Sequence, residues 1–256
     1  MGIDFSKYRM TFDIHTHTIY SRGLIRPHGK GTIEENVQAA IAAGLSEVAI
    51  SDHGPGHHFY GLSMGKVPEM RQEIRRLQEK YPQIRIGLSV EANVVDTPGN
   101  CLDVSPGEFG AFDFVLAGYH YGASHGRTLQ NMLDHKGLLP EAAGKALERK
   151  NTDMTVRALR QNRLKVLTHP GDKARFDIAE LAAVCAETGT WMEISTWHEH
   201  LTVEEIRVCM KEDVQFIISS DAHTPDRVGS FRGGLERAFE AGLPIERIVN
   251  VERIGE

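Results

Sequence analysis

Two histidines stand one residue apart at the end of a short apolar segment. They are His15 and His17, and Asp13 precedes them at the same spacing. Because successive side chains of a strand point to opposite faces, all three side chains are expected on one side of a strand. Two imidazoles at this spacing can chelate one ion, and a neighbouring carboxylate can support the ligating rings. The pair therefore predicts a metal site, although a His-X-His pair alone is weak evidence.

Similar residues end most of the other apolar segments that we expect to form strands. Those residues are His53, Glu91, His120, His169, Asp221 and His223. Six of the seven expected strands finish in this way, and only the sixth, which ends Glu193-Ile-Ser195-Thr196, departs from the pattern. Imidazole and carboxylate groups are ligands of zinc, manganese and iron. Their joint occurrence predicts a centre for divalent metal ions.

The remaining histidines follow no such pattern. His28 lies in the loop Pro27-His28-Gly29, where the residues alone leave a solvated position and a metal ligand equally open. His57 directly follows the segment 51–56 and is expected to line the rim of a pocket. We expect structural or surface roles, in polar loops or at helix ends, for His58, His125, His135, His198 and His200.

The elements that position these residues are short apolar runs that alternate with amphipathic segments. The expected strands are 9–15, 47–51, 85–90, 112–118, 165–168, 190–194 and 214–219, and 247–251 is either an eighth strand or a connection. Between them, a capping box of Thr32 and Glu35 begins a helix that Gly44 ends. Further helical patterns cover 68–81, 147–162, 177–188, 202–212 and 235–241.

This alternation indicates parallel β-α-β units in one α/β domain. Seven strands favour a distorted TIM-like barrel over an open doubly wound sheet, and no GxGxxG or GxxxxGK[ST] motif follows the first strand. In either architecture the carboxyl ends of the strands meet at one edge, so the predicted ligands would gather there. No linker or change in composition divides the chain, and the domain is expected to span residues 1–256.

The composition is that of an ordinary globular protein. The chain has 256 residues and a formal net charge of −6, with 41% hydrophobic and 25% charged residues. No membrane-length apolar run, signal-peptide core or CxxC pair is present, so we expect a cytoplasmic protein without a membrane partner. The sequence has no stripe of lysine and arginine interleaved with aromatic residues, so a nucleic-acid partner is not expected. Oligomeric state is not indicated by any pattern.

Seven short motifs together resemble the PHP (polymerase and histidinol phosphatase) superfamily of metal-dependent phosphoesterases. They are DIHTHT at 13–18, PHGKGT at 27–32, SDHGPG at 51–56, VEAN at 90–93, AGYH at 117–120, THPG at 168–171 and SSDAHT at 219–224. Their order matches the family across nearly the entire chain, and they look closest to small stand-alone PHP phosphatases. The resemblance implies a distorted (β/α)7 barrel that holds up to three divalent ions, of zinc, manganese or iron.

The resemblance also implies how the ligands divide among the ions. His15, His17, Glu91 and Asp221 would hold the first ion, Glu91, His120 and His169 the second, and His28, His53 and His223 the third. A hydroxide that bridges the first two ions beside Glu91 would be the nucleophile, and the third ion would bind a phosphoryl oxygen. Asp221 and Asp13 would orient ligands, and His57 is a candidate acid for the leaving group. Candidates for binding the phosphate are Arg22, Arg175 and Arg227, which lie in loops after strand ends.

The function implied in this way is hydrolysis of a phosphomonoester of a small metabolite, and histidinol phosphate is one candidate. A phosphodiesterase or 3'-5' exonuclease is an alternative, although the chain lacks a basic groove for nucleic acid. An amidohydrolase would be expected to use a lysine at a middle strand end, where this chain has His53, Glu91 and His120. A non-enzymatic, metal-binding regulatory module is the remaining alternative, and it would not hydrolyse an aryl phosphate ester.

Overall fold

Seven parallel strands form the sheet at the centre of the protein. In this computed structural model, which describes residues 3–21, 23 and 28–255, the strand order is β2-β3-β4-β5-β6-β7-β8. The strands are β2 (Phe12–Thr16), β3 (Glu47–Ile50), β4 (Arg85–Asn93), β5 (Phe114–Gly118), β6 (Val166–Leu167), β7 (Trp191–Ser195) and β8 (Phe216–Ser219). The spatial order follows the sequence, so all carboxyl ends lie at one edge of the sheet.

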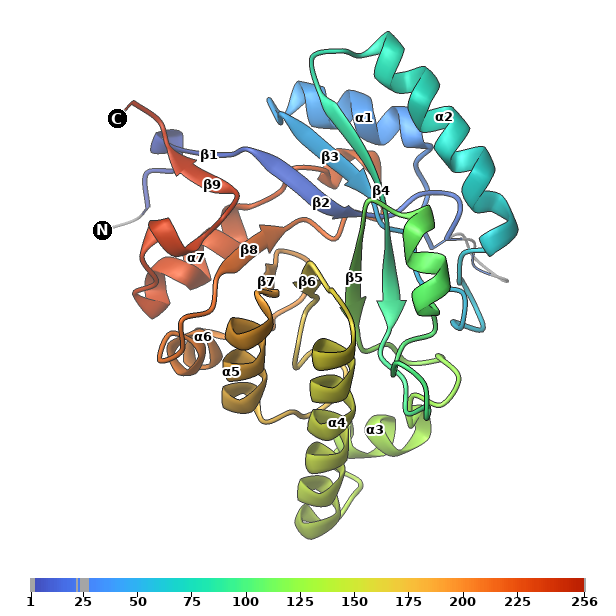
Figure 1. Cartoon of the computed structure of the whole chain (residues 1–256). Coiled ribbons are helices and arrows are strands. Elements are labelled where there is room, and N and C mark those ends of the chain that lie inside the picture. The colour runs from blue at the N-terminus through green and yellow to red at the C-terminus, as the bar shows by residue number, and fades with distance from the viewer. Residues whose placement is uncertain (1–2, 22, 24–27, 256) are drawn as a thin grey trace.

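The sheet curves until its two edge strands meet. Thr16, at the end of β2, pairs in parallel with Ala222, which follows β8. The His17 N–H donates to the Ala222 carbonyl at 2.8 Å, and this contact places the segment 15–17 beside 221–223. The expected fold, a single-domain α/β structure with a distorted TIM-like barrel, is confirmed (Figure 1).

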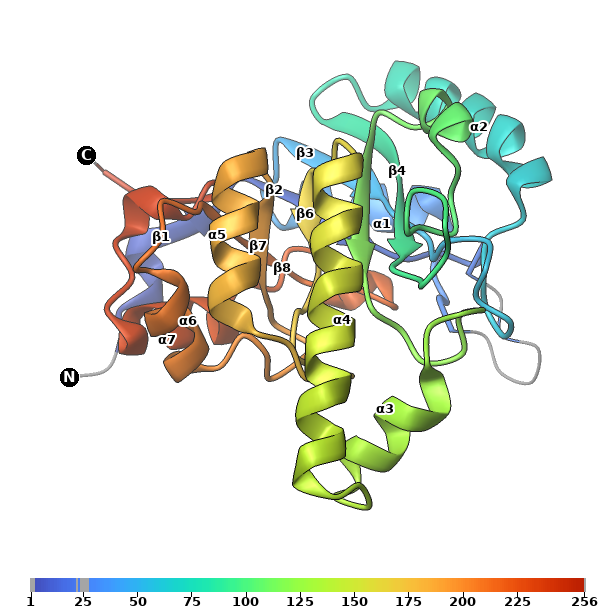
Figure 2. The ribbon, with the colours of Figure 1, turned by 60° about the horizontal axis from the view of Figure 1, so that its bottom comes forward.

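Helices cover the outside of this barrel (Figures 1 and 2). They are α1 (Ile33–Ala42), α2 (Val67–Lys80), α3 (Thr128–His135), α4 (Glu141–Gln161), α5 (Ile178–Thr188), α6 (Val203–Cys209) and α7 (Arg232–Ala241). Figure 2 shows that α3 and the first half of α4 extend beyond the barrel. Among the described residues, no helix combines the length and the apolar character that crossing a membrane requires.

The start of α1 shows how local sequence sets an element boundary. The Thr32 hydroxyl accepts a hydrogen bond from the Glu35 N–H at 3.2 Å, and the Glu35 carboxylate accepts one from the Thr32 N–H at 2.8 Å. These two bonds satisfy amide donors that a helix start otherwise leaves unpaired. The predicted capping box is confirmed, and Gly44, just beyond the helix, adopts a φ of +76° that favours glycine.

Apolar side chains pack on both sides of the barrel wall. One cluster takes a residue from each of five strands: Ile14, Ala49, Leu116, Val166 and Ile217. The larger cluster joins the outward-facing strand residues, such as Val48 and Ile50, to helix residues such as Val37 and Leu181. The interior cluster fills the barrel below its carboxyl edge, so the polar side chains above it stand on a packed floor.

Several elements differ from the sequence prediction. The expected strand 9–15 is divided at Thr11, because β1 (Tyr8–Met10) pairs antiparallel with β9 (Val251–Arg253) instead of joining the barrel. The register of β2 against β3 also shifts between Asp13 and Thr16, which breaks the strict alternation expected there. Segment 247–251 leads into β9 and adds no strand to the barrel.

One strand boundary and one further helix also differ from the prediction. Strand β4 continues to Asn93, so Glu91 lies inside the strand rather than after it. Helix α3 lies within the segment 121–140, for which no helix was predicted from the sequence.

Candidate metal centre

The carboxylate of Glu91 lies at the centre of a cluster of imidazoles. It is fully buried, and it projects from β4 at the carboxyl edge of the barrel. Five ring nitrogens surround its two oxygens. Oε1 lies 2.9 Å from His169 Nε2, 3.3 Å from His15 Nε2 and 3.3 Å from His120 Nε2, whereas Oε2 lies 3.0 Å from His53 Nδ1 and 3.6 Å from His17 Nε2.

Asp221 extends this cluster toward the junction of β2 and β8, where the barrel closes. Its Oδ1 lies 3.0 Å from His17 Nε2, 3.5 Å from His15 Nε2 and 3.5 Å from His223 Nδ1. His28 joins through His223, because their Nε2 atoms are 2.7 Å apart. All nine residues expected as metal ligands therefore lie in one continuous cluster, although the chain distributes them from position 15 to position 223.

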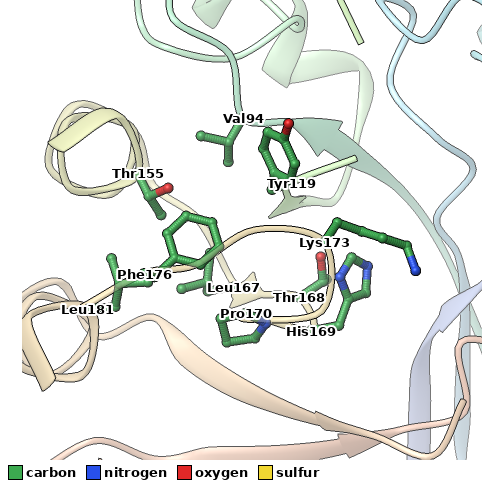
Figure 3. A pocket seen from close by; sticks show the side chains of 10 residues that line it. All are labelled: Val94, Tyr119, Thr155, Leu167, Thr168, His169, Pro170, Lys173, Phe176 and Leu181. Carbon is green, nitrogen blue, oxygen red and sulfur yellow. The ribbon is translucent and has the colours of Figure 1, made fainter. Parts of the chain in front are cut away.

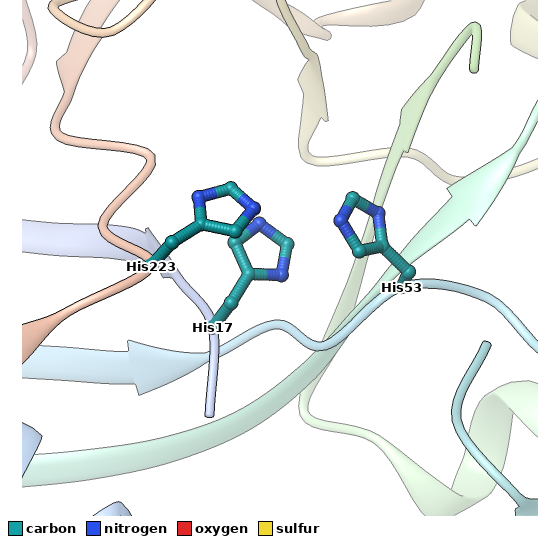
Figure 4. A group of neighbouring side chains, drawn as sticks. All are labelled: His17, His53 and His223. Carbon is teal, nitrogen blue, oxygen red and sulfur yellow. The ribbon is translucent and has the colours of Figure 1, made fainter. Parts of the chain in front are cut away.

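Three of the imidazoles are drawn in Figure 4. The rings of His17 and His53 are 4.3 Å apart between centroids, and those of His17 and His223 are also 4.3 Å apart. Their nitrogens lie within 4.8 Å of one another, a spacing at which one ion could contact all three. This grouping differs from the expected division, which put His28 rather than His17 with His53 and His223.

Several polar atoms of this cluster form no well-directed hydrogen bond. Among the described residues, none makes such a bond to the following buried atoms, although His53 Nδ1 lies 3.0 Å from Glu91 Oε2: His15 Nε2, His17 Nδ1, His53 Nδ1, His53 Nε2, His120 Nε2 and Glu91 Oε2. Leaving so many buried polar atoms unpaired is costly, whereas metal coordination would satisfy their lone pairs. Imidazole nitrogens combined with carboxylate oxygens suit zinc, manganese or iron. The residues present therefore fit divalent metal ions.

Burial keeps several of these imidazoles neutral. Removal from water, reinforced by nearby histidines, lowers the pKa of His17 to about 4 and that of His28 to about 3. The same two causes hold the pKa of His53 well below its ordinary value. A neutral imidazole offers a lone pair to a cation, so these side chains are already in the ligating form at neutral pH.

Acceptors behind the imidazoles fix the orientation of the rings. Glu193 accepts a hydrogen bond from His15 Nδ1 at 2.6 Å and another from the backbone N–H of His169 at 2.8 Å. Asn93 Oδ1 lies 2.8 Å from His120 Nδ1 in the same way. With Nδ1 donating to such a partner, the Nε2 lone pair faces the centre of the cluster.

Glu193 is a residue of the cluster that sequence reasoning missed. The sixth expected strand departs from the pattern because its acidic residue lies before the strand end. Its signal was a carboxylate inside an otherwise apolar strand, which can be buried only with partners. Asp13, expected to support the histidine pair, accepts hydrogen bonds from the backbone N–H groups of Gly229 at 2.9 Å, of Ser220 at 3.4 Å and of His15 at 3.5 Å.

Close packing explains some of the small residues in the motifs. The Thr168 hydroxyl donates to Glu91 Oε1 at 2.6 Å, and a Cβ on Gly118 would lie only 2.1 Å from that hydroxyl oxygen. Asp103 accepts hydrogen bonds from the backbone of Asn93 and Gly56, and a Cβ on Gly54 would lie 2.4 Å from its carboxylate. Glycine is therefore required where backbone and carboxylates approach most closely.

The wall behind His169 is largely apolar. A pocket there is lined by Leu167, Phe176 and Leu181 on one side and by His169 and Lys173 on the other (Figure 3).

His169 has a φ of +27°, a left-handed backbone conformation that a non-glycine residue seldom adopts. Such strain persists only where the surrounding structure holds it, and here the hydrogen bond to Glu193 does so.

His57 lines the cluster but already has partners on both ring nitrogens. Its Nε2 donates to the Tyr121 carbonyl at 2.7 Å, and its Nδ1 accepts from the Phe59 N–H at 3.2 Å. Burial, with His120 as the next cause, lowers the pKa of His57 to about 4. Backbone groups thus hold both ring nitrogens, and a role of His57 as the acid for the leaving group stays a prediction.

The three arginines expected to bind phosphate have different surroundings. Arg22 lies outside the described residues. Arg175 Nε is 2.9 Å from Asp134 Oδ2, so its charge is already paired beside α3. The guanidinium of Arg227 lies 4.4 Å from the centroid of the Trp197 ring, which in turn is 5.9 Å from the His223 ring. Of the two described arginines, Arg227 is thus the one connected to the cluster.

The position of His198 also differs from expectation. We expected a structural or surface role, but only 15% of its side chain is exposed and its ring lies between two carboxylates. Nδ1 is 3.1 Å from Asp172 Oδ2 and Nε2 is 3.1 Å from Asp221 Oδ2. Although burial opposes it, the pairing with Asp172 and Asp221 raises the pKa of His198 to about 9.

Comparison with known proteins decides the family. A model of the PHP domain matches residues 13–196, which is more than half of the chain. The chain belongs to the PHP family. A relative from Acetivibrio thermocellus, named "Probable phosphatase", is 27% identical over 266 residues, covering 97% of this chain and 95% of its own.

Solved structures agree on the fold. Histidinol phosphate phosphatase from Lactococcus lactis, solved with zinc, L-histidinol and phosphate, has a TM-score of 0.56 at 16% identity, covering 92% of this chain and 95% of its own. A structure from Listeria monocytogenes has a TM-score of 0.64 at 14% identity, covering 86% of this chain and 98% of its own. At these identities the likeness concerns the PHP barrel alone.

The role of Glu193 can be tested by Glu193→Gln. The amide cannot accept both hydrogen bonds as the carboxylate does, so His15 and the His169 loop lose their support. We expect divalent-metal affinity to fall about 10- to 100-fold, measured by competition with a chelating dye. Glu199→Gln, an exposed change in the loop after the same strand, is the control. Unchanged affinity in Glu193→Gln would show that Glu193 does not orient a metal ligand.

Proposed function

We propose that this PHP protein is a metal-dependent phosphatase that hydrolyses a phosphomonoester of a small metabolite. The observation that carries the proposal is the single cluster of seven histidines, Glu91 and Asp221 with unpaired, buried donor atoms. Family membership and the phosphatase name of the relative support a hydrolase that acts on phosphoric esters. The proposed cofactors are up to three divalent ions of zinc, manganese or iron.

The proposed ligands are the nine residues of the cluster: His15, His17, His28, His53, Glu91, His120, His169, Asp221 and His223. Divalent ions bound by such a set would supply an activated water at neutral pH and positive charge opposite the phosphoryl oxygens. Glu91, which has ring nitrogens near both of its oxygens, would contact more than one ion, and Asp221 would offer a second carboxylate where β2 and β8 meet. The Thr168 hydroxyl holds the Glu91 carboxylate in position.

The protein's own charges complement the proposed substrate. Arg227 is the arginine that we propose to contact the phosphate, because its guanidinium lies over the Trp197 ring, which is 5.9 Å from the His223 ring. A guanidinium can bind two phosphate oxygens at once. Histidinol phosphate is the first substrate to test, since the Lactococcus lactis protein of similar fold was solved with L-histidinol and phosphate.

The proposed domain extends beyond the segment that the family model matches. That segment ends at residue 196, whereas Asp221 and His223 follow β8, the last strand of the barrel. Without this part the barrel would lack its closing strand and two proposed ligands. We therefore propose one PHP domain over residues 1–256. A cytoplasmic location stays a prediction from composition.

The proposed function predicts a metal requirement that depends on Glu91. Protein loaded with Mn²⁺ or Zn²⁺ should hydrolyse p-nitrophenyl phosphate, and chelator-treated protein should not. Glu91→Ala should lose at least two ions by elemental analysis and at least about 100-fold in activity, because the bridging carboxylate is removed. Glu199→Ala serves as the exposed-residue control.

Two outcomes would contradict this account. Undiminished metal content in folded Glu91→Ala would refute the bridging role. Metal-loaded wild-type protein that hydrolyses neither p-nitrophenyl phosphate nor any phosphorylated metabolite in a screen would refute the phosphatase itself, and would favour a metal-binding regulatory module. Faster hydrolysis of a phosphodiester such as bis-p-nitrophenyl phosphate would favour the phosphodiesterase alternative.

The proposed role of Arg227 is tested by Arg227→Met, which keeps the length of the side chain but removes its charge. We expect the inhibition constant of inorganic phosphate to rise about 10-fold or more, because a hydrogen bond to a charged group contributes about 1.5 kcal/mol. Arg175→Met removes a guanidinium that is paired with Asp134, and it should leave the inhibition constant unchanged. The reverse pattern would assign the phosphate to Arg175.

A further inference from the structure

We infer that His198 is an additional metal ligand, and that His169, His198 and Asp221 hold one divalent transition-metal ion at the outer edge of the cluster. This inference rests on the proposed metal centre, but the nine-residue set expected from the PHP resemblance does not include His198. The ligand atoms of these three residues lie within 4.8 Å of one another.

The two oxygens of Asp221 face different imidazoles. Oδ1 faces His17 at 3.0 Å and His15 at 3.5 Å, whereas Oδ2 is 3.1 Å from His198 Nε2. An N···O separation of 3.1 Å fits two adjacent ligands of one ion, since zinc binds nitrogen and oxygen at about 2.0 to 2.2 Å. Oδ2 is thus available to a second ion while Oδ1 serves the first.

His198 also has the backing that the expected ligands have. Its Nδ1 is 3.1 Å from Asp172 Oδ2, a carboxylate oxygen that also pairs with Lys173, and Nδ1 of His15 and of His120 likewise lies against an acceptor, Glu193 or Asn93. In each case an acceptor behind the ring leaves Nε2 for the cluster. A carboxylate behind a ligating imidazole orients the ring and strengthens it as a donor.

Local structure brings the three ligands together from separate loops. His169 follows β6, His198 follows β7 and Asp221 follows β8, so three neighbouring strands each contribute one. The rings of His169 and His198 are 4.8 Å apart between centroids. Under the PHP resemblance, the ion that His169 would bind has only Glu91 and His120 as its other protein ligands. His198 and Asp221 would add two ligands to this ion on its outer side.

The test is zinc binding to the full chain after chelator treatment, followed with a competing chelating dye. His198→Ala should bind one ion at least about 100-fold more weakly, because losing a ligand costs at least as much as losing the group behind it, and the other ions should bind as in wild type. Asp172→Asn should weaken the same ion about 10- to 100-fold without lowering the number of ions bound at saturation.

The matched control is His200→Ala, which removes an imidazole two residues away that pairs with Glu205 outside the cluster. It should leave all zinc affinities unchanged. Free imidazole added to His198→Ala should restore the zinc affinity of the weakened site. The visible spectrum of the Co²⁺-loaded protein should change in His198→Ala but not in His200→Ala.

The inference is overturned if His198→Ala binds zinc like wild type, or if both alanine variants weaken zinc equally. Either result leaves the proposed function intact when wild-type protein still binds metal and hydrolyses phosphate esters. Failure of the wild-type protein to bind zinc would instead refute the metal centre on which the inference depends.

Discussion

A buried carboxylate that several imidazoles surround is the constraint on which the rest of the site depends. Glu91 is removed from water, and the cluster histidines hold its pKa well below the ordinary value despite burial, so the group stays negative. A buried charge is tolerated only with compensating charge and directed bonds. Several of the imidazoles around Glu91 are neutral and offer lone pairs, so divalent cations bound among them would supply compensating positive charge.

The barrel exists, in functional terms, to bring distant strand ends to this carboxylate. Parallel strands in sequential order place every carboxyl end at one edge, and closure between Thr16 and Ala222 joins the first and last ligand segments. The packed interior cluster below then fixes the depth of the polar groups. A second set of residues, Glu193, Asn93 and Asp103, sets the orientation of side chains that the strands only position.

Much of this could be predicted from sequence because the signals are local. Strand ends that carry His-X-His or Asp-X-His, and helices that begin with Thr32 and Glu35, depend on nearby residues only. Glu193 and His198 were not predicted as parts of the site, because their roles arise from partners far away in the chain. Glu193 binds the His15 ring, which lies 178 positions earlier in the chain. His198 contacts Asp172 and Asp221 only because folding brings their loops together.

The strand boundaries failed for a related reason. Nothing local distinguishes β1 from β2, because the break at Thr11 is set by pairing with the far end of the chain. The bulge between Asp13 and Thr16 likewise comes from registration against β3, and it redirects Asp13 toward the backbone of Gly229. Residue identity was thus informative about donor chemistry, and tertiary pairing decided which donor faces which partner.

The most direct measurement is an anomalous-difference map at a metal absorption edge, from crystals of protein prepared without chelator. The account predicts two or three peaks among the nine cluster residues, with Glu91 within about 2.2 Å of at least two of them, a typical length for a bond from a carboxylate oxygen to zinc. A map with no peak within bonding distance of Glu91, from crystals shown to contain metal, would contradict it.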